Sequence, residues 1–220
     1  MLFDLRGRGR RRTVQAIYLA LAFVMVGGLL LVGVGTGSGG GILNAFTNNG
    51  SSGNQNQVVS QAETSALKQT RLHPSDPAGW AALVQARWTS AGQGANYNAG
   101  TGAFTAAGKT ELSGATQAWQ QYLKLVRNPD SNLAILAARA YAAQGNYAQA
   151  ANTWETETLA TPDQSKGFQC LAANAYAAKQ IRKGDLAAAK AVSLTPKVAR
   201  LTLQQALQQA KTSPQVAQSC

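Results

Sequence analysis

The chain has 220 residues and a formal net charge of +11, with a single histidine and two cysteines. One histidine and two distant cysteines are too few for a metal site, and Cys170 and Cys220 do not form the CxxC pair of a thioredoxin-type redox centre. No glycine-rich phosphate loop follows a predicted strand, and no strand pattern is convincing anywhere. The sequence therefore predicts no catalytic residue, no metal and no cofactor, and we expect a protein that is not an enzyme.

The first 35 residues have the pattern of a membrane anchor. Residues 1–13 carry five arginines against one aspartate, and residues 14–35 are almost unbroken in apolar character. As a helix this apolar segment would be about 33 Å long, which matches the hydrocarbon core of a bilayer. The positive-inside rule leaves residues 1–13 in the cytoplasm and places the chain after residue 36 outside. The sequence thus predicts a single-pass protein of a bacterial cytoplasmic (inner) membrane.

A cleaved signal peptide is the competing interpretation of this segment. Signal peptides have apolar stretches of about 7–15 residues, followed by a small-x-small cleavage site. The best available site, Leu43-Asn44-Ala45, is a poor one, so we favour an uncleaved anchor. Gly33 and Gly37 have the small-xxx-small spacing that permits self-association of the transmembrane helix. Residues 36–57 then form a flexible linker rich in Gly, Ser and Asn.

Two helices and an insertion are predicted next. Residues 57–71 fit an amphipathic helix that ends before His73-Pro74. A second helix begins at Asp76-Pro77, because proline is favoured in the first turn. Residues 92–108 are a Gly-rich insertion whose composition is too flexible for a helix, and the partner helix resumes near Thr110.

Residues 131–164 carry the most regular pattern, a 34-residue helix–turn–helix. Small and aromatic residues occupy positions 4, 7, 8, 11, 15, 17, 20, 24 and 32 of this unit, namely Ala134, Ala137, Ala138, Tyr141, Gly145, Tyr147, Ala150, Trp154 and Pro162. Ala138 and Ala150 are expected to face each other across the hairpin, because small side chains let two helices approach closely. Gly145 is expected at the turn that ends the first helix.

A third hairpin is predicted downstream, with Ala172, Ala173 and Tyr176 at positions 7, 8 and 11 of the unit. Residues 179–183 are expected to add one extra turn, which puts Ala189 at position 20. A capping helix follows over residues 196–211, and residues 212–220 form a tail.

This pattern resembles the tetratricopeptide-repeat (TPR) family in its membrane-anchored, extracytoplasmic form. The resemblance implies an all-α, TPR-like helical hairpin solenoid over residues 58–211, with about three repeats and a capping helix. An ordinary Ala-rich helical bundle with accidental spacing is the alternative.

The resemblance also implies a groove, lined by the first helix of each repeat, that holds a peptide. Transferring groove positions 5, 9 and 12 gives Ala81, Gln85, Trp88, Ile135, Arg139, Ala142, Cys170, Asn174 and Ala177. We select five of them as candidate partner-binding residues: Gln85, Trp88, Ile135, Arg139 and Asn174. Trp88 and Arg139 are the expected anchors, against the simpler interpretations of solenoid packing and a solvated face. The implied function is a scaffold or chaperone-like module for a protein or peptide partner, in envelope assembly or beside the translocon.

A basic face is predicted on the last third of the chain, where residues 165–220 carry a net charge of +7. Its residues are Lys179, Arg182, Lys183, Lys190, Lys197 and Arg200. Because this face lies outside the cytoplasm in the predicted topology, we expect no nucleic-acid partner. Anionic lipid, a cell-wall polymer or an acidic polypeptide would suit it, while a solvated helix face is the alternative. It supports a second hypothesis, an accessory or regulatory subunit of a cell-envelope enzyme or of a cytochrome c maturation complex.

The two cysteines would lie in a compartment where disulfides persist. Residues 212–220, fully extended, reach about 30 Å, so Cys220 could return to Cys170 and close a loop. A buried free cysteine and a free terminal cysteine are the alternative.

Overall fold

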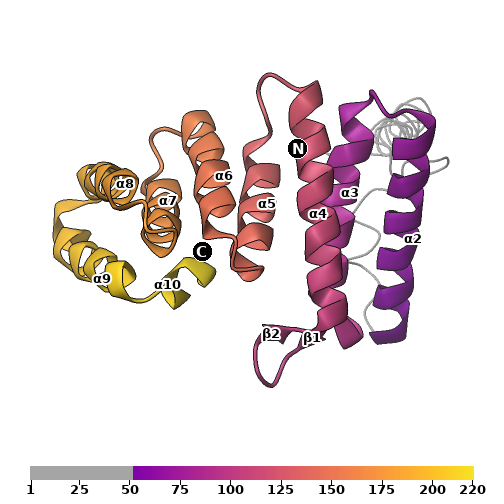
Figure 1. The fold of residues 1–220 in the computed structure, drawn as a ribbon, viewed down its shortest axis with the longest axis horizontal. Coiled ribbons are helices and arrows are strands. Elements are labelled where there is room, and N and C mark those ends of the chain that lie inside the picture. Colours follow the sequence, from indigo (N-terminus) through magenta and orange to yellow (C-terminus); the bar gives the residue numbers. More distant parts are fainter. Residues whose placement is uncertain (1–51) are drawn as a thin grey trace, which may run out of the picture. The chain divides into compact units, whose positions relative to one another are not determined.

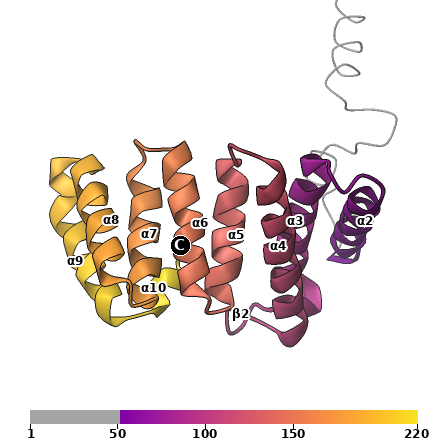
Figure 2. The same cartoon turned by 45° about the horizontal axis from the view of Figure 1, so that its top comes forward.

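The computed structural model describes the backbone of residues 52–220 and the side chains from residue 59 onward. This part of the chain contains nine α-helices and one two-stranded hairpin. Their bounds are α2 Ser52–Leu72, α3 Pro77–Ala91, β1 Tyr97–Asn98, β2 Ala103–Phe104, α4 Ala106–Leu125, α5 Ser131–Ala143, α6 Tyr147–Ala160, α7 Ser165–Ala177, α8 Ile181–Leu194, α9 Arg200–Thr212 and α10 Gln215–Gln218. The helices from α2 to α9 lie side by side in chain order (Figure 1, Figure 2). The expectation of an all-helical, repeat-like fold is confirmed at this level.

Polar side chains fix where several helices begin. The carboxylates of Asp76 and Asp130 accept hydrogen bonds from backbone N–H groups in the first turns of α3 and α5, and the Thr105 hydroxyl does the same for α4. Such caps satisfy N–H groups that have no partner inside the helix. The predicted helix starts at Asp76-Pro77 and near residue 131 are therefore confirmed, and α4 begins slightly earlier than predicted.

The hairpins α5–α6 and α7–α8 repeat with a period of 34 residues. Each helix boundary of the second hairpin lies 34 residues after its counterpart in the first. The turns also match, because Asn146 N donates to Tyr141 O at 2.9 Å and Gln180 N donates to Ala175 O at 2.8 Å. Gly145, with φ of 75°, takes the left-handed position of the first turn, as predicted.

The predicted register of the third hairpin is wrong by one residue in α7 and by more in α8. No extra turn exists at residues 179–183, since α8 begins at Ile181. Lys179 takes the left-handed turn position with φ of 60°, so the turn carries no glycine signal. Gly184, and not Ala189, therefore stands where Ala150 stands in the preceding hairpin. A Cβ at Gly184 would collide with the ring of Tyr176, which explains the glycine there by packing.

The Gly-rich insertion contains more structure than expected. A 3-10 turn, Gly94–Asn96, leads into β1 and β2, which pair antiparallel with Tyr97 opposite Phe104. The Phe104 ring lies 5.2 Å from the Tyr97 ring and 6.3 Å from the Trp88 ring, measured between centroids. The hairpin is thereby packed against the end of α3.

The apolar core lies between successive helices as three clusters. One joins α2 to α6 around Trp119 and Leu133, one joins α5 to α10 around Trp154 and Cys170, and a small one surrounds Leu112. Ala138 and Ala150 are both fully buried but belong to different clusters. Their direct pairing across the hairpin stays a prediction.

Most predictions for the N-terminal part of the chain concern residues that the structure does not describe. The basic segment at 1–13 and the transmembrane helix at 14–35 lie outside the described residues. Within residues 52–220, no helix is long and apolar enough to cross a bilayer. Helix α2 begins at Ser52, inside the segment predicted as linker, and α10 lies inside the predicted tail.

Candidate functional site

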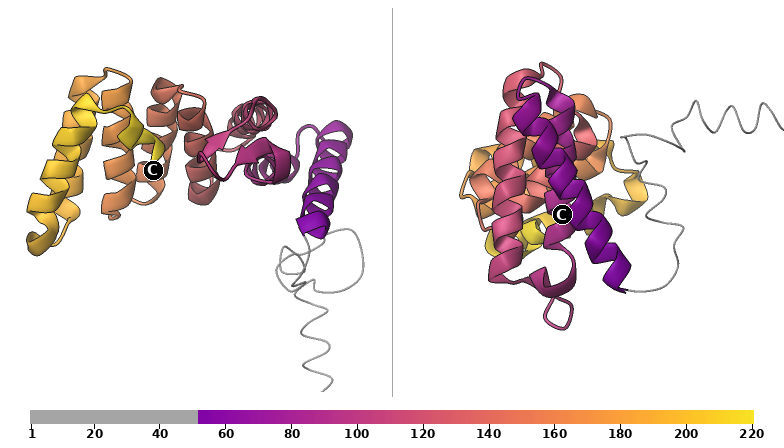
Figure 3. Two further views of the ribbon diagram at one scale, coloured as in Figure 1. Left: turned by 90° about the horizontal axis from the view of Figure 1, so that it is seen from below. Right: turned by 90° about the vertical axis from the view of Figure 1, so that its right-hand side faces the viewer.

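The C-terminal segment, residues 213–220, lies back on the repeats. Helix α9 packs on α7 and α8, and after the turn at Ser213-Pro214 the short helix α10 contacts both α7 and α5. The C end consequently lies back toward α5 and not beyond α9 (Figure 3). Ala217 is only 1% exposed and belongs to the apolar cluster around Trp154 and Cys170, and Val216 packs against that cluster. We call the surface of α5 and α7 beneath this segment the α5–α7 face.

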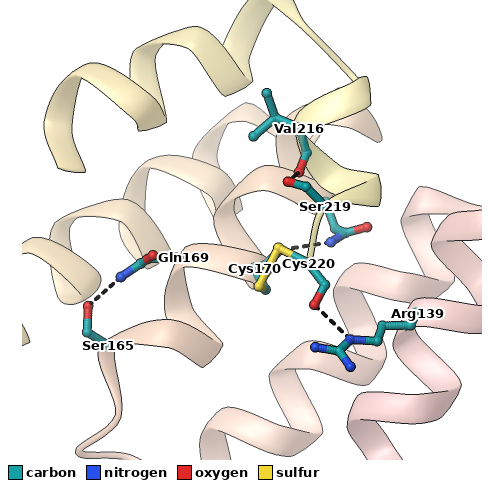
Figure 4. Close-up of a disulfide and its surroundings, with 8 residues drawn as sticks. Arg139, Ser165, Gln169, Cys170, Val216, Ser219 and Cys220 are labelled. Carbon is teal, nitrogen blue, oxygen red and sulfur yellow. Dashed lines mark hydrogen bonds between the residues drawn. A yellow bond between two sulfur atoms is a disulfide. The ribbon is translucent and has the colours of Figure 1, made fainter. Parts of the chain in front are cut away.

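A disulfide joins this segment to α7 (Figure 4). It links Cys170 to Cys220, whose Cα atoms are 5.5 Å apart, across a sequence separation of 50 residues. Cys170 is fully buried, whereas Cys220 is partly exposed. The two halves of the bond thus differ in their access to solvent.

Two hydrogen bonds connect the segment to the preceding repeat. The Nε of Arg139, on α5, donates to the main-chain oxygen of Cys220 at 2.7 Å (Figure 4). The side-chain amide of Gln218 donates to the hydroxyl of Tyr147, the first residue of α6, at 3.0 Å. Arg139 therefore recognises backbone and not a particular side chain.

The structure brings two of the five candidate groove residues, Arg139 and Ile135, to the α5–α7 face. Arg139 is exposed and bound to Cys220, and half-buried Ile135 packs against the cluster around Cys170. Asn174 is fully buried. Its amide nitrogen donates to Cys170 O at 2.9 Å, while its Oδ1 has no partner among the described residues. Asn174 therefore does not line an open groove.

The predicted groove positions of the third hairpin are also wrong by one residue, but this error does not explain the burial, because Ala173 and Tyr176 at the corrected positions are buried too. The 34-residue period assigns groove positions 5, 9 and 12 of the third hairpin to Gln169, Ala173 and Tyr176, each one residue before the predicted Cys170, Asn174 and Ala177. Ala142, also predicted to line the groove, is 2% exposed.

The other two candidates lie on α3, away from α10. Gln85 is exposed. Trp88 is half-buried and packs in the cluster with Leu112, next to Phe104 from the insertion hairpin. Trp88 therefore has a packing role in this structure.

Several residues of the predicted basic face are engaged within the domain. Lys183 pairs with Glu155 at 2.8 Å, and the Lys190 ammonium lies 5.9 Å from the ring centroid of Phe168. Arg200 donates to the carbonyls of Thr195 and Ser193 at the end of α8. Lys179 forms a turn, and Arg182 and Lys197 are exposed. These cations serve different local roles, so they are not a single free patch.

Sequence reasoning missed the cluster that holds α9 in place. Asp185 accepts hydrogen bonds from Lys211 at 2.8 Å and from the Tyr176 hydroxyl at 2.9 Å, and the Lys211 ammonium lies 5.2 Å from the Tyr176 ring centroid. These two hydrogen bonds lower the pKa of Asp185, and the bond from Lys211 has the larger effect. Burial is the main cause that raises the pKa of the Tyr176 hydroxyl, and its hydrogen bond to the Asp185 carboxylate raises it further. The only available signal was the i, i+9 spacing of Tyr176 and Asp185 across a turn.

A second charged cluster lies between α2, α3 and α4. Arg87 pairs with Glu63 at 3.3 Å. Burial is the main cause that raises the pKa of Glu111, and the negative charge of Glu63 raises it further. The positive charge of Arg87 opposes both effects. No group of three or more His, Cys, Asp or Glu side chains within residues 52–220 is placed to hold a metal ion.

No protein-family model matches the chain, and comparison with curated proteins gives no match. The class of protein is therefore defined by structure alone: stacked helical hairpins with a 34-residue period in α5–α8.

Proposed function

We propose that this chain is a membrane-tethered, extracytoplasmic TPR-type scaffold that binds a peptide segment of a protein partner on its α5–α7 face. The observation that carries the proposal is the peptide segment already bound there, residues 213–220. It is held by burial of Ala217 and by the contact of Arg139 with a main-chain oxygen. A backbone contact with few side-chain pockets suits many peptide sequences.

The membrane tether and the compartment rest on the sequence. The arginines before residues 14–35 and the absence of charged residues between Arg12 and Glu63 support an anchor with its N-terminus inside. Protease added to spheroplasts should digest the repeats of a chain that resists carbonate extraction. Protection of the repeats would exclude the extracytoplasmic assignment.

Photo-crosslinking in the native envelope tests partner binding. A photoreactive amino acid at position 132, where Asn132 is exposed and lies two helical turns before Arg139 on α5, should capture a discrete protein in membranes treated with dithiothreitol, and mass spectrometry identifies it. The matched control is position 198, where Val198 is 94% exposed and lies before α9. Capture of the same proteins from both positions, or of none from position 132 after reduction, would contradict binding at the α5–α7 face.

The alternative of an accessory subunit that docks through the basic face receives less support. Lys183 and Arg200 already bind groups within the domain, and Lys190 lies over Phe168. A partner would have to displace these contacts.

A further inference from the structure

We infer that residues 213–220 are an intramolecular ligand of the α5–α7 face, that the Cys170–Cys220 disulfide locks them there, and that a dithiol reductant opens the face to a partner peptide. The inference rests on the proposed function, because it assumes that the face is a peptide site. It adds that the site is closed in the oxidised protein and names what closes it.

The non-covalent contacts of the segment are few. Helix α10 has four residues, which is too short for a helix that is stable by itself. Ala217 is its one fully buried side chain, and the hydrogen bonds from Arg139 and Gln218 are both exposed to solvent. Exposed hydrogen bonds contribute little net stability, since water replaces them. The covalent bond therefore holds much of the segment in place.

The rest of the C-terminal region has its own attachment. Leu207 and Ala210 of α9 are buried in the cluster with Cys170, and Lys211 is bound to Asp185. Helix α9 ends at Thr212, and the backbone is extended at Ser213 before Pro214. Opening the disulfide consequently frees residues 213–220 while α9 stays docked.

Burial determines which sulfur atom a dissolved thiol can approach. A thiolate of the dithiol attacks Sγ of the partly exposed Cys220, forms a mixed disulfide with it, and breaks the bond to Cys170, which leaves as a thiolate and takes up a proton. The second thiol of the reductant then attacks its own sulfur in the mixed disulfide and releases the Cys220 thiolate. The dithiol is oxidised to a disulfide, and the protein gains two thiols. Attack depends on access to the sulfur, so the fully buried Cys170 is not the first target.

The released segment indicates the chemistry of the partner. It presents a β-branched and a small aliphatic residue, Val216 and Ala217, to the apolar cluster, and a main-chain oxygen to Arg139. We therefore expect a partner segment with two adjacent small aliphatic residues followed, within a few residues, by a main-chain oxygen that accepts a hydrogen bond from Arg139. No side chain of opposite charge is required.

Hydrogen exchange on the full chain in detergent tests the release. With dithiothreitol, amides of residues 213–220 should exchange at least about tenfold faster, whereas those of α9 should change little. Circular dichroism checks that the helices persist. Unchanged exchange in residues 213–220 would overturn the inference. It would not affect the proposed function, which the crosslinking experiment tests separately.

Peptide binding tests what the open face accepts. The probe is a fluorescein-labelled peptide of residues 213–220 carrying Cys220→Ser, which prevents covalent capture. Because the tethered segment competes at high effective concentration, the host is the full chain with Ala217→Asp and dithiothreitol, since a buried aspartate expels the segment. Fluorescence anisotropy should show binding at least about tenfold tighter than to the oxidised wild-type chain.

The control host carries Val198→Asp, the same added charge at an exposed position. In dithiothreitol it should bind the probe less tightly than the Ala217→Asp host, because its own segment still competes. Adding Arg139→Ala to the Ala217→Asp host should weaken binding. Release in hydrogen exchange without any probe binding to the opened host would overturn the inference and the proposed function together.

Discussion

Lys179 holds the backbone in the same left-handed region as Gly145, 34 residues earlier in the chain: φ is 60° at Lys179 and 75° at Gly145. Each residue ends the first helix of a hairpin and is followed by a backbone hydrogen bond that closes the turn. A side chain with a Cβ is strained in this region, whereas glycine is not. The turn at Lys179 therefore carries backbone strain that the same turn at Gly145 does not.

Lys179→Gly should stabilise the domain. Removing the Cβ relieves a strain of about 1 kcal/mol, offset in part by the greater freedom of glycine in the unfolded chain. Urea unfolding of the full chain in detergent measures the change. Gly145→Ala is the matched control and should destabilise; a gain in stability for both variants would show that φ is not the cause.

Gly184→Ala should destabilise the domain by about 1–3 kcal/mol, because the added methyl group overpacks the contact between α8 and the Tyr176 ring. Thermal unfolding followed by circular dichroism gives the difference. Gly92→Ala is the control, since its φ of −87° suits alanine and the nearest atom to its Cβ lies 3.8 Å away. Similar losses for the two variants would disprove the packing explanation.

Reduction of the disulfide should lower the stability of the domain. In the chain-entropy model a loop of this length contributes roughly 4 kcal/mol. Unfolding in urea, with and without dithiothreitol, measures the loss. Cys220→Ser should match the reduced wild-type chain and should not respond to the reductant. Two alkylatable thiols in protein purified without reductant would show that the bond is absent from the native envelope.

Asp185→Asn should weaken the dependence of stability on pH in the acid range. The pKa of Asp185 is lower in the folded state than its ordinary value, so this carboxylate stabilises the fold above its unfolded pKa. That contribution is lost as the pH falls through the folded pKa. Melting temperatures between about pH 2 and pH 6 should fall less in the variant than in the wild type. The control is Asp163→Asn, at an exposed turn; an equal effect there would assign the acid sensitivity elsewhere.

Local signals in the sequence predicted much of the fold. Asp76-Pro77 and Gly145 are a helix start and a turn residue whose roles depend on neighbours a few positions away, so both were located correctly. The turn at Lys179 was missed because its residue type argues against the conformation that the tertiary fold imposes. The strands β1 and β2 have two residues each, which is too short for an alternating pattern.

The site was less predictable than the fold. Arg139 was chosen from its place in the repeat, but its contact with Cys220 spans 81 residues of sequence and depends on where α9 directs the chain. The one-residue shift that displaced the predicted groove positions of the third hairpin is visible only in the helix boundaries. The reach of the last residues allowed a bond between Cys170 and Cys220 without requiring it.

The disulfide also changes how the domain carries mechanical load. A force applied between Ser52 and Cys220 passes through the sulfur–sulfur bond at Cys170 and bypasses the 50-residue loop that contains most of α7 and all of α8 and α9. About 170 Å of contour length is thereby withheld from extension. When the oxidised chain is stretched, the helices from α2 to α6 should unfold under the load. The helices inside the covalent ring bear no load and should stay folded.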